Sequence, residues 1–162
     1  MKTLLIIDMQ NGFIKKENKK LPSLIASHIS KENYGEVLFT KFINYSQSPF
    51  VRLLGWKKLF TSPETDIVPE LMPFVKSGSV FIKSTYSAFK SKKLLSFLKR
   101  KGIKKLDMCG LESDGCVLGS AFEAFDLGFE VNVLRKLIFS TAALNKATDG
   151  ILERNIDRLG KK

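Results

Sequence analysis

A carboxylate, an ammonium group and a thiol each stand at the end of an apolar run, or just after one, in this 162-residue chain. Asp8 directly follows one run, Lys83 closes a second, and Cys116 comes after a small polar turn that ends a third. Together such groups can hydrolyse an amide: the carboxylate takes the thiol proton, the ammonium stabilises the negative charge, and the thiolate attacks the carbonyl carbon. Because Cys116 opens a stretch of helical periodicity, the helix dipole should also lower the pKa of its thiol.

The elements that must position these groups alternate along the chain. The pattern predicts strands at residues 3–7, 36–42, 79–83, 104–109 and 130–139, and helices at residues 21–30, 91–101, 116–127 and 142–159. This alternation is typical of a parallel sheet with helices on its faces. Ligands bind beyond the carboxyl ends of the strands in such sheets, so we expect the three groups to meet at one edge. Residues 44–76, which hold four of the five prolines, are the least regular segment.

Length and composition fit one domain, residues 1–162, with a single substantial core. Two cysteines and one histidine are too few for a disulfide scaffold or a zinc cluster. We expect Cys109 to be a core residue and His28 an ordinary side chain. The apolar start is soon interrupted by Asp8, and nothing resembles a signal peptide or a membrane span. A reduced, cytoplasmic protein is the simplest interpretation.

The net charge of +11 comes mainly from lysine clusters. One interpretation is a surface for nucleic acid or another polyanion. However, the clusters fall at predicted helix ends and connections, without interleaved aromatic residues or a known binding motif. We therefore expect solvated lysines and no nucleic-acid partner, with weak polyanion binding as a side effect.

Three segments resemble the motifs of the isochorismatase-like cysteine hydrolases, a superfamily that includes nicotinamidases and other amidohydrolases. Residues 5–13 (LIIDMQNGF) are similar to its opening D-x-Q-x-x-F motif, residues 80–89 (VFIKSTYSAF) to its lysine strand, and residues 109–117 (CGLESDGCV) to its nucleophile turn. The resemblance extends from about residue 4 to residue 139. It implies a three-layer α/β/α fold around a mostly parallel sheet of five or six strands, and a homo-oligomer, either a dimer or a tetramer.

The resemblance also assigns roles to individual residues. Asp8, Lys83 and Cys116 would form the catalytic triad. A non-proline cis peptide bond is implied between Leu111 and Glu112, and the backbone N–H groups of Glu112 and Cys116 would hold the oxyanion.

Further residues are expected to form the substrate pocket. The aromatic candidates for its wall, which could equally be core residues, are Phe13, Phe42, Trp56, Tyr86 and Phe89. Asn44 and Ser113 are candidates for direct substrate contacts.

Two departures from the family pattern narrow the function. Nicotinamidases bind a metal through histidines that residues 44–47 lack, so we expect no metal and no cofactor. Isochorismatases proper, which cleave a vinyl ether, generally lack the nucleophilic cysteine. The sequence therefore predicts a metal-independent cysteine hydrolase of a small amide, imide or carbamoyl compound. Two alternatives stay open: a vinyl-ether hydrolase, and a non-catalytic binding relative with the same fold.

Overall fold

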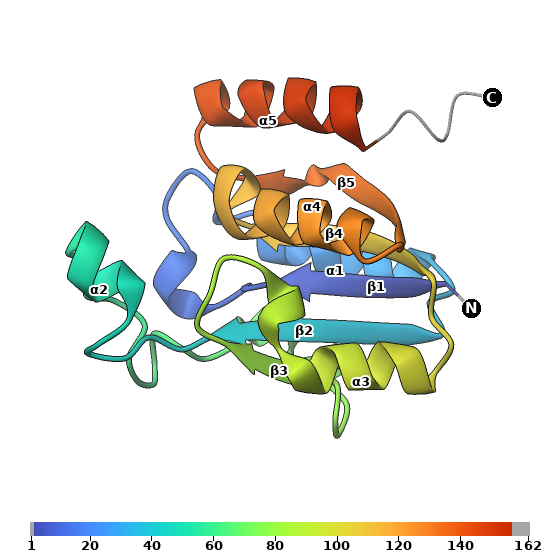
Figure 1. Cartoon of the computed structure of the whole chain (residues 1–162), viewed down its shortest axis with the longest axis horizontal. Helices are drawn as coiled ribbons and strands as arrows, with labels where there is room; N and C mark the ends of the chain where they lie inside the picture. Colours follow the sequence, from blue (N-terminus) through green and yellow to red (C-terminus); the bar gives the residue numbers. More distant parts are fainter. Residues whose placement is uncertain (1, 157–162) are drawn as a thin grey trace.

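The computed structural model describes residues 2–156 and has a five-stranded parallel sheet at its centre (Figure 1). The strand order is β3-β2-β1-β4-β5, and all four pairings are parallel. The strands are β1 (Thr3–Ile7), β2 (Glu36–Phe42), β3 (Val80–Lys83), β4 (Lys105–Leu111) and β5 (Glu130–Phe139). The predicted α/β class and the five strands are confirmed.

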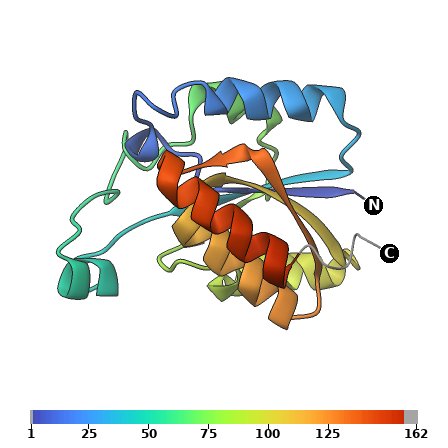
Figure 2. The same cartoon turned by 90° about the horizontal axis from the view of Figure 1, so that it is seen from above.

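Helices cover both faces of the sheet and make the molecule three layers deep (Figure 2). The helices of the described residues are α1 (Leu21–Lys31), α2 (Pro49–Leu54), α3 (Lys92–Arg100), α4 (Leu118–Asp126) and α5 (Ala142–Asn155), of which α2 lies beyond the ends of the strands. In Figure 2, α1 lies on one face, and α3, α4 and α5 lie on the other. In the part of the chain that the structure describes, none of the helices has the length and apolarity needed to cross a membrane.

The central strand β1 is buried on both faces, which explains its unbroken apolar sequence. Its side chains alternate between two cores. Leu5 and Ile7 pack into the core beneath α3 and α4, whereas Leu4 and Ile6 pack into the core beneath α1. Both cores therefore hold β1 in register with its neighbours.

The chain reverses its direction of travel across the sheet between β1 and β4. From β1 it builds outward to β2 and β3, and then returns to the other side of β1 to form β4 and β5. A crevice opens at such a switch point, beyond the carboxyl ends of the two strands. Figure 1 shows the strand arrows pointing to the side of the molecule on which α2 lies.

Two elements differ from the sequence-based prediction. The helix predicted from residue 116 begins at Leu118, after a π-helical turn formed by Ser113–Val117. The irregular segment contains α2, which starts at a side-chain cap, with the Ser48 hydroxyl accepting from the N–H of Val51, and ends at Gly55. The last predicted helix is seen to Asn155, and its predicted end at residues 157–159 lies outside the described residues.

Candidate active site

The side chains of Asp8, Lys83 and Cys116 meet at the crevice, as the sequence predicts. The Lys83 Nζ lies 2.6 Å from Asp8 Oδ2 and 3.3 Å from the Cys116 Sγ, and it donates to the carbonyl of Thr85 at 2.8 Å. The side chains of Asp8 and Lys83 are 0% exposed. The ammonium thus contacts three acceptors in a buried site, and its charge is matched by that of the carboxylate.

Thr40, on the neighbouring strand β2, holds the Asp8 carboxylate in one orientation. Its hydroxyl donates to Asp8 Oδ1 at 2.7 Å and accepts from the Asp8 N–H at 3.1 Å. Asp8 needs this support because its φ of 49° lies in the left-handed region, which is unfavourable for a residue with a side chain. With Oδ1 bound to Thr40, Oδ2 is left to face Lys83.

Gly110 allows β4 to approach the end of β1. Its φ is 118°, and a Cβ at this position would lie 2.1 Å from the carbonyl oxygen of Ile7. No other residue type fits this contact. Because Ile7 directly precedes Asp8, and Gly110 lies near the end of the strand that leads into the turn carrying Cys116, this glycine brings the carboxylate and the thiol together.

Gln10 ties the loop after β1 to its neighbours. Its side-chain amide donates to the carbonyls of Phe42 and Thr65 at 2.8 and 2.9 Å, and its oxygen accepts from the Phe42 N–H at 2.7 Å. Gln10 is completely buried. The glutamine of the D-x-Q motif is therefore a structural residue that fixes the floor of the crevice.

The expected lowering of the thiol pKa at Cys116 is wrong. Burial raises the pKa of this thiol, the nearby Asp8 carboxylate raises it further, and the Lys83 ammonium opposes both only in part. The sulfur also lies within the π-helical turn before α4, not at the first residue of a long helix. At Lys83, burial alone would lower the pKa, but Asp8 and then Cys116 raise it. The resting site therefore holds a neutral thiol beside a carboxylate–ammonium pair.

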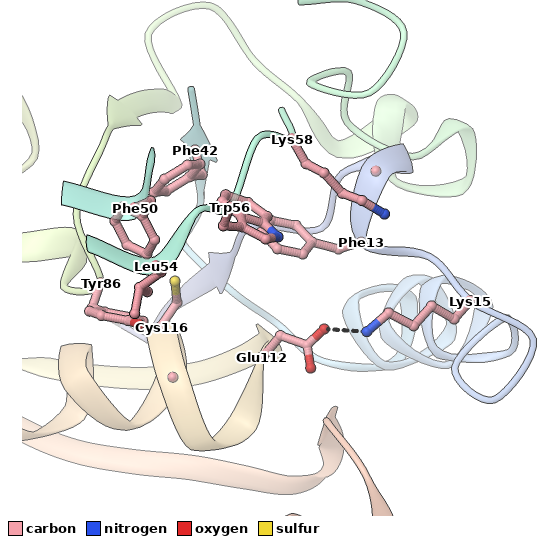
Figure 3. Close-up of a pocket in the computed structure, with 12 residues that line it drawn as sticks. Phe13, Lys15, Phe42, Phe50, Leu54, Trp56, Lys58, Tyr86, Glu112 and Cys116 are labelled. Atoms are coloured by element: carbon pink, nitrogen blue, oxygen red, sulfur yellow. Dashed lines mark hydrogen bonds and ion pairs between the residues drawn. The ribbon is translucent and has the colours of Figure 1, made fainter. Parts of the chain in front are cut away.

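A cavity of about 400 Å³ opens above the Cys116 sulfur (Figure 3). Its wall is largely aromatic, and the sulfur points toward the rings in Figure 3. The rings contact one another: Phe13 stacks on Trp56 with centroids 6.1 Å apart, and Phe50 packs on Tyr86 at 4.8 Å. The aromatic residues of the wall are Phe13, Phe42, Phe50, Trp56 and Tyr86.

Four of the predicted aromatic residues line this pocket, and Phe89 does not. Phe89 is 1% exposed, and its ring packs on Phe129 in the core of the α4 face. Asn44 and Ser113 do not line the pocket either. The Asn44 amide donates to two carbonyls of the following loop, and the Ser113 hydroxyl donates to Asn145 on α5 at 2.7 Å. These contacts favour a structural role for both.

Sequence reasoning missed part of the pocket. Phe50 and Leu54 reach it from α2, which was not predicted, although the Ser48–Pro49 start and the Gly55 end are recognisable helix signals. Charged side chains border it as well: Lys58, and the pair formed by Lys15 and Glu112 at 3.3 Å. The Leu111–Glu112 peptide bond is cis, as the family resemblance implied.

The fold and this buried cluster define the class of protein: a three-layer α/β domain with a thiol, a carboxylate and an ammonium at its switch point. The isochorismatase domain model matches residues 2–149, and the chain belongs to this family. Nicotinamidase 3 of Arabidopsis thaliana is 29% identical over 134 residues, which cover 79% of this chain and 68% of that protein.

Solved structures share the fold. An isochorismatase-like hydrolase from Alkaliphilus metalliredigens has a TM-score of 0.84 at 18% identity, covering 95% of this chain and 92% of that one. N-carbamoylsarcosine amidase from Thermoplasma acidophilum has a TM-score of 0.82 at 21% identity, covering 96% of this chain and 93% of that one. Pyrazinamidase of Pyrococcus horikoshii, in complex with zinc, has a TM-score of 0.82 at 21% identity, covering 96% of each chain. The predicted class of enzyme, a hydrolase of C–N bonds other than peptide bonds, is the class to which such relatives belong.

The residues of this chain do not fit the metal seen in one of these relatives. Between residues 2 and 156 there is no group of three or more His, Cys, Asp or Glu side chains placed to hold a metal ion. The single histidine, His28, lies on α1 and contacts the Tyr34 hydroxyl at 2.9 Å.

Proposed function

We propose that this protein is a metal-independent cysteine hydrolase that cleaves a small amide, imide or carbamoyl compound through an acyl-enzyme on Cys116. One observation carries the proposal. The Lys83 ammonium contacts both the Asp8 carboxylate, at 2.6 Å, and the Cys116 sulfur, at 3.3 Å, directly beneath an aromatic pocket. This arrangement supplies a base, a nucleophile and a fixed positive charge at one point.

The first half of the reaction forms the acyl-enzyme. Asp8 takes the proton of the Cys116 thiol, and the buried Lys83 ammonium stabilises the resulting thiolate. The sulfur attacks the carbonyl carbon, and the backbone N–H groups of Glu112 and Cys116 hold the oxyanion. Asp8 then donates its proton to the departing nitrogen, so that ammonia or an amine leaves.

The second half releases the acid. Asp8, ionised again, takes a proton from a water molecule that attacks the thioester carbonyl, and it returns this proton to the sulfur as the thioester bond breaks. Lys83 stays protonated throughout, because either Asp8 or the Cys116 sulfur carries a negative charge beside its ammonium before and after each tetrahedral intermediate. The cycle leaves the thiol neutral, as in the resting enzyme.

The pocket supports a small, flat acyl group. A volume of about 400 Å³ lies at the small end of the range for ligand pockets. Aromatic walls pack well on a planar, conjugated group. The relatives named for nicotinamide, pyrazinamide and N-carbamoylsarcosine act on small compounds that carry an amide or carbamoyl group, which supports the same substrate class here.

The test is an ammonia-release screen over small amides, with Cys116→Ala beside the wild type. The matched control is Cys109→Ala, because Cys109 is the other buried cysteine and does not line the pocket. We expect Cys116→Ala to lose at least about 10³-fold in kcat, and Cys109→Ala to retain activity. Quenched wild-type reactions should show the acyl group on Cys116 by mass spectrometry. Hydrolysis that survives in Cys116→Ala would refute the mechanism.

A further inference from the structure

The charged groups around the pocket balance one another, with one exception. Asp8 and Lys83 form an ion pair beneath it, and Lys15 and Glu112 form another at its edge. Lys58 also borders the cavity, and within residues 2–156 its ammonium has no ion-pair partner. The pocket therefore carries one uncompensated positive charge, and this charge belongs to Lys58.

The backbone of Lys58 is held firmly at this edge. Its carbonyl accepts from the Asn44 amide at 3.1 Å. The next residue, Leu59, is completely buried with a φ of 58°, and its N–H donates to the Glu64 carboxylate at 2.7 Å. The Leu59 carbonyl in turn accepts from the Asn44 N–H at 2.8 Å. An unfavourable φ persists only where the surroundings enforce it, so the loop presents Lys58 to the pocket in a defined place.

The aromatic wall separates this charge from the nucleophile. Phe13, Trp56 and Lys58 all border the cavity that Cys116 lines. In Figure 3 the Lys58 side chain and the Cys116 sulfur lie on different sides of the two rings. A substrate with its carbonyl carbon at the sulfur would lie along the rings, with its far end toward Lys58.

We propose that Lys58 is a specificity-determining residue that selects substrates with an anionic group, such as a carboxylate, at the end of the acyl part farthest from the amide. This inference rests on the proposed function, since it assigns the substrate class of the same site. An ammonium is a compact charge that pairs with a carboxylate, and apolar walls on one side weaken its screening by water. The preferred substrates are thus flat, singly charged amides rather than neutral ones.

A pair of alkylating probes tests the charge selection without requiring hydrolysis. The probes are 3-(chloroacetyl)benzoate and 2-chloro-1-(3-nitrophenyl)ethanone. They share an electrophile, and one carries a carboxylate on the acyl ring where the other carries a neutral nitro group of similar shape. In both, the Cys116 sulfur displaces chloride and the thiol proton passes to Asp8. The measured quantity is the ratio of the two alkylation rates at Cys116, followed by mass spectrometry.

We expect Lys58→Met to lower this ratio about fivefold, which is the upper end for an exposed ion pair. Lys58→Arg should retain the ratio because it keeps the charge, and so should the control Lys57→Met, which removes a lysine that does not line the pocket. High salt should reduce the wild-type ratio. A ratio that is equal in the wild type and Lys58→Met overturns the proposal.

Hydrolysis of 3-carbamoylbenzoate against 3-nitrobenzamide separates this inference from the proposed function. The wild type should favour the carboxylate compound in kcat/KM, and Lys58→Met should lose this preference, mainly through KM. If the alkylation ratio responds to Lys58 but neither amide is hydrolysed more slowly by Cys116→Ala, then the acyl-enzyme mechanism fails and the charge selection stands. If both amides are cleaved through Cys116 and the ratio of their kcat/KM values is the same in the wild type and in Lys58→Met, the charge selection fails instead.

Discussion

Replacing Lys83 with methionine should test whether the buried ion pair holds the site together. The change keeps the approximate length of the side chain and removes the ammonium, so that the Asp8 carboxylate, 0% exposed, loses its counter-charge at 2.6 Å. Breaking a buried pair by removing one partner costs about 3–5 kcal/mol. For a domain of this size, such a loss lowers Tm by about 10 °C.

A double-mutant cycle separates the charge from the packing. In Asp8→Asn/Lys83→Met both charges are gone, and no uncompensated carboxylate remains. We therefore expect the double variant to recover most of the stability that Lys83→Met loses. The measurement is urea unfolding at pH 7 for the wild type, both single variants and the double variant. The reasoning is refuted if the free energy of unfolding of Lys83→Met lies within about 0.5 kcal/mol of that of the wild type. It is also refuted if the double variant is no more stable than Lys83→Met.

Two further predictions concern residues around the triad. Thr40→Val removes the hydroxyl that orients Asp8, and it should lower kcat about tenfold or more with little change in KM, since a hydrogen bond to a charged group contributes about 1.5–3 kcal/mol. Thr40→Ser should restore kcat, and a purely structural role would instead lower only Tm. Burial raises the pKa of the Cys109 thiol above 9.0, so this thiol stays protonated in the folded protein while the unfolded chain loses the proton. The contribution of this thiol to stability is thus complete below pH 9 and declines above pH 9. Cys109→Ala should therefore make the alkaline decline in the free energy of unfolding shallower by about 1.4 kcal/mol per pH unit, measured by urea unfolding under reducing conditions. An unchanged slope contradicts this prediction.

The fold and the triad could be predicted because both depend on local sequence and a simple topological rule. Apolar runs such as β1 are buried on both faces whatever the details of packing, so their positions follow from the local sequence alone. Once the strands are parallel, their carboxyl ends share an edge, and residues after those ends must converge. Asp8, Lys83 and Cys116 needed nothing more to be placed together.

The pocket could not be predicted to the same extent, because distant contacts shape it. The backbone of Lys58 and Leu59 is held beside the cavity by hydrogen bonds to Asn44 and Glu64, and none of these contacts is visible as a sequence pattern. Phe89 belongs to the same motif, residues 80–89, as Lys83 and Tyr86, yet its ring packs in the core. Whether an aromatic side chain lines a pocket or fills a core is decided by tertiary packing.

The raised pKa of the Cys116 thiol is compatible with the proposed reaction. A neutral thiol beside an ion pair has the same net charge as a neutral carboxylic acid beside a thiolate–ammonium pair. Proton transfer from Cys116 to Asp8 therefore only moves the negative charge that pairs with the Lys83 ammonium from the carboxylate to the thiolate. The Lys83 Nζ already lies 2.6 Å from one oxygen and 3.3 Å from the sulfur, so it can stabilise either anion without moving. Burial, which raises the pKa of the free thiol, costs little in this exchange because the buried charge stays constant.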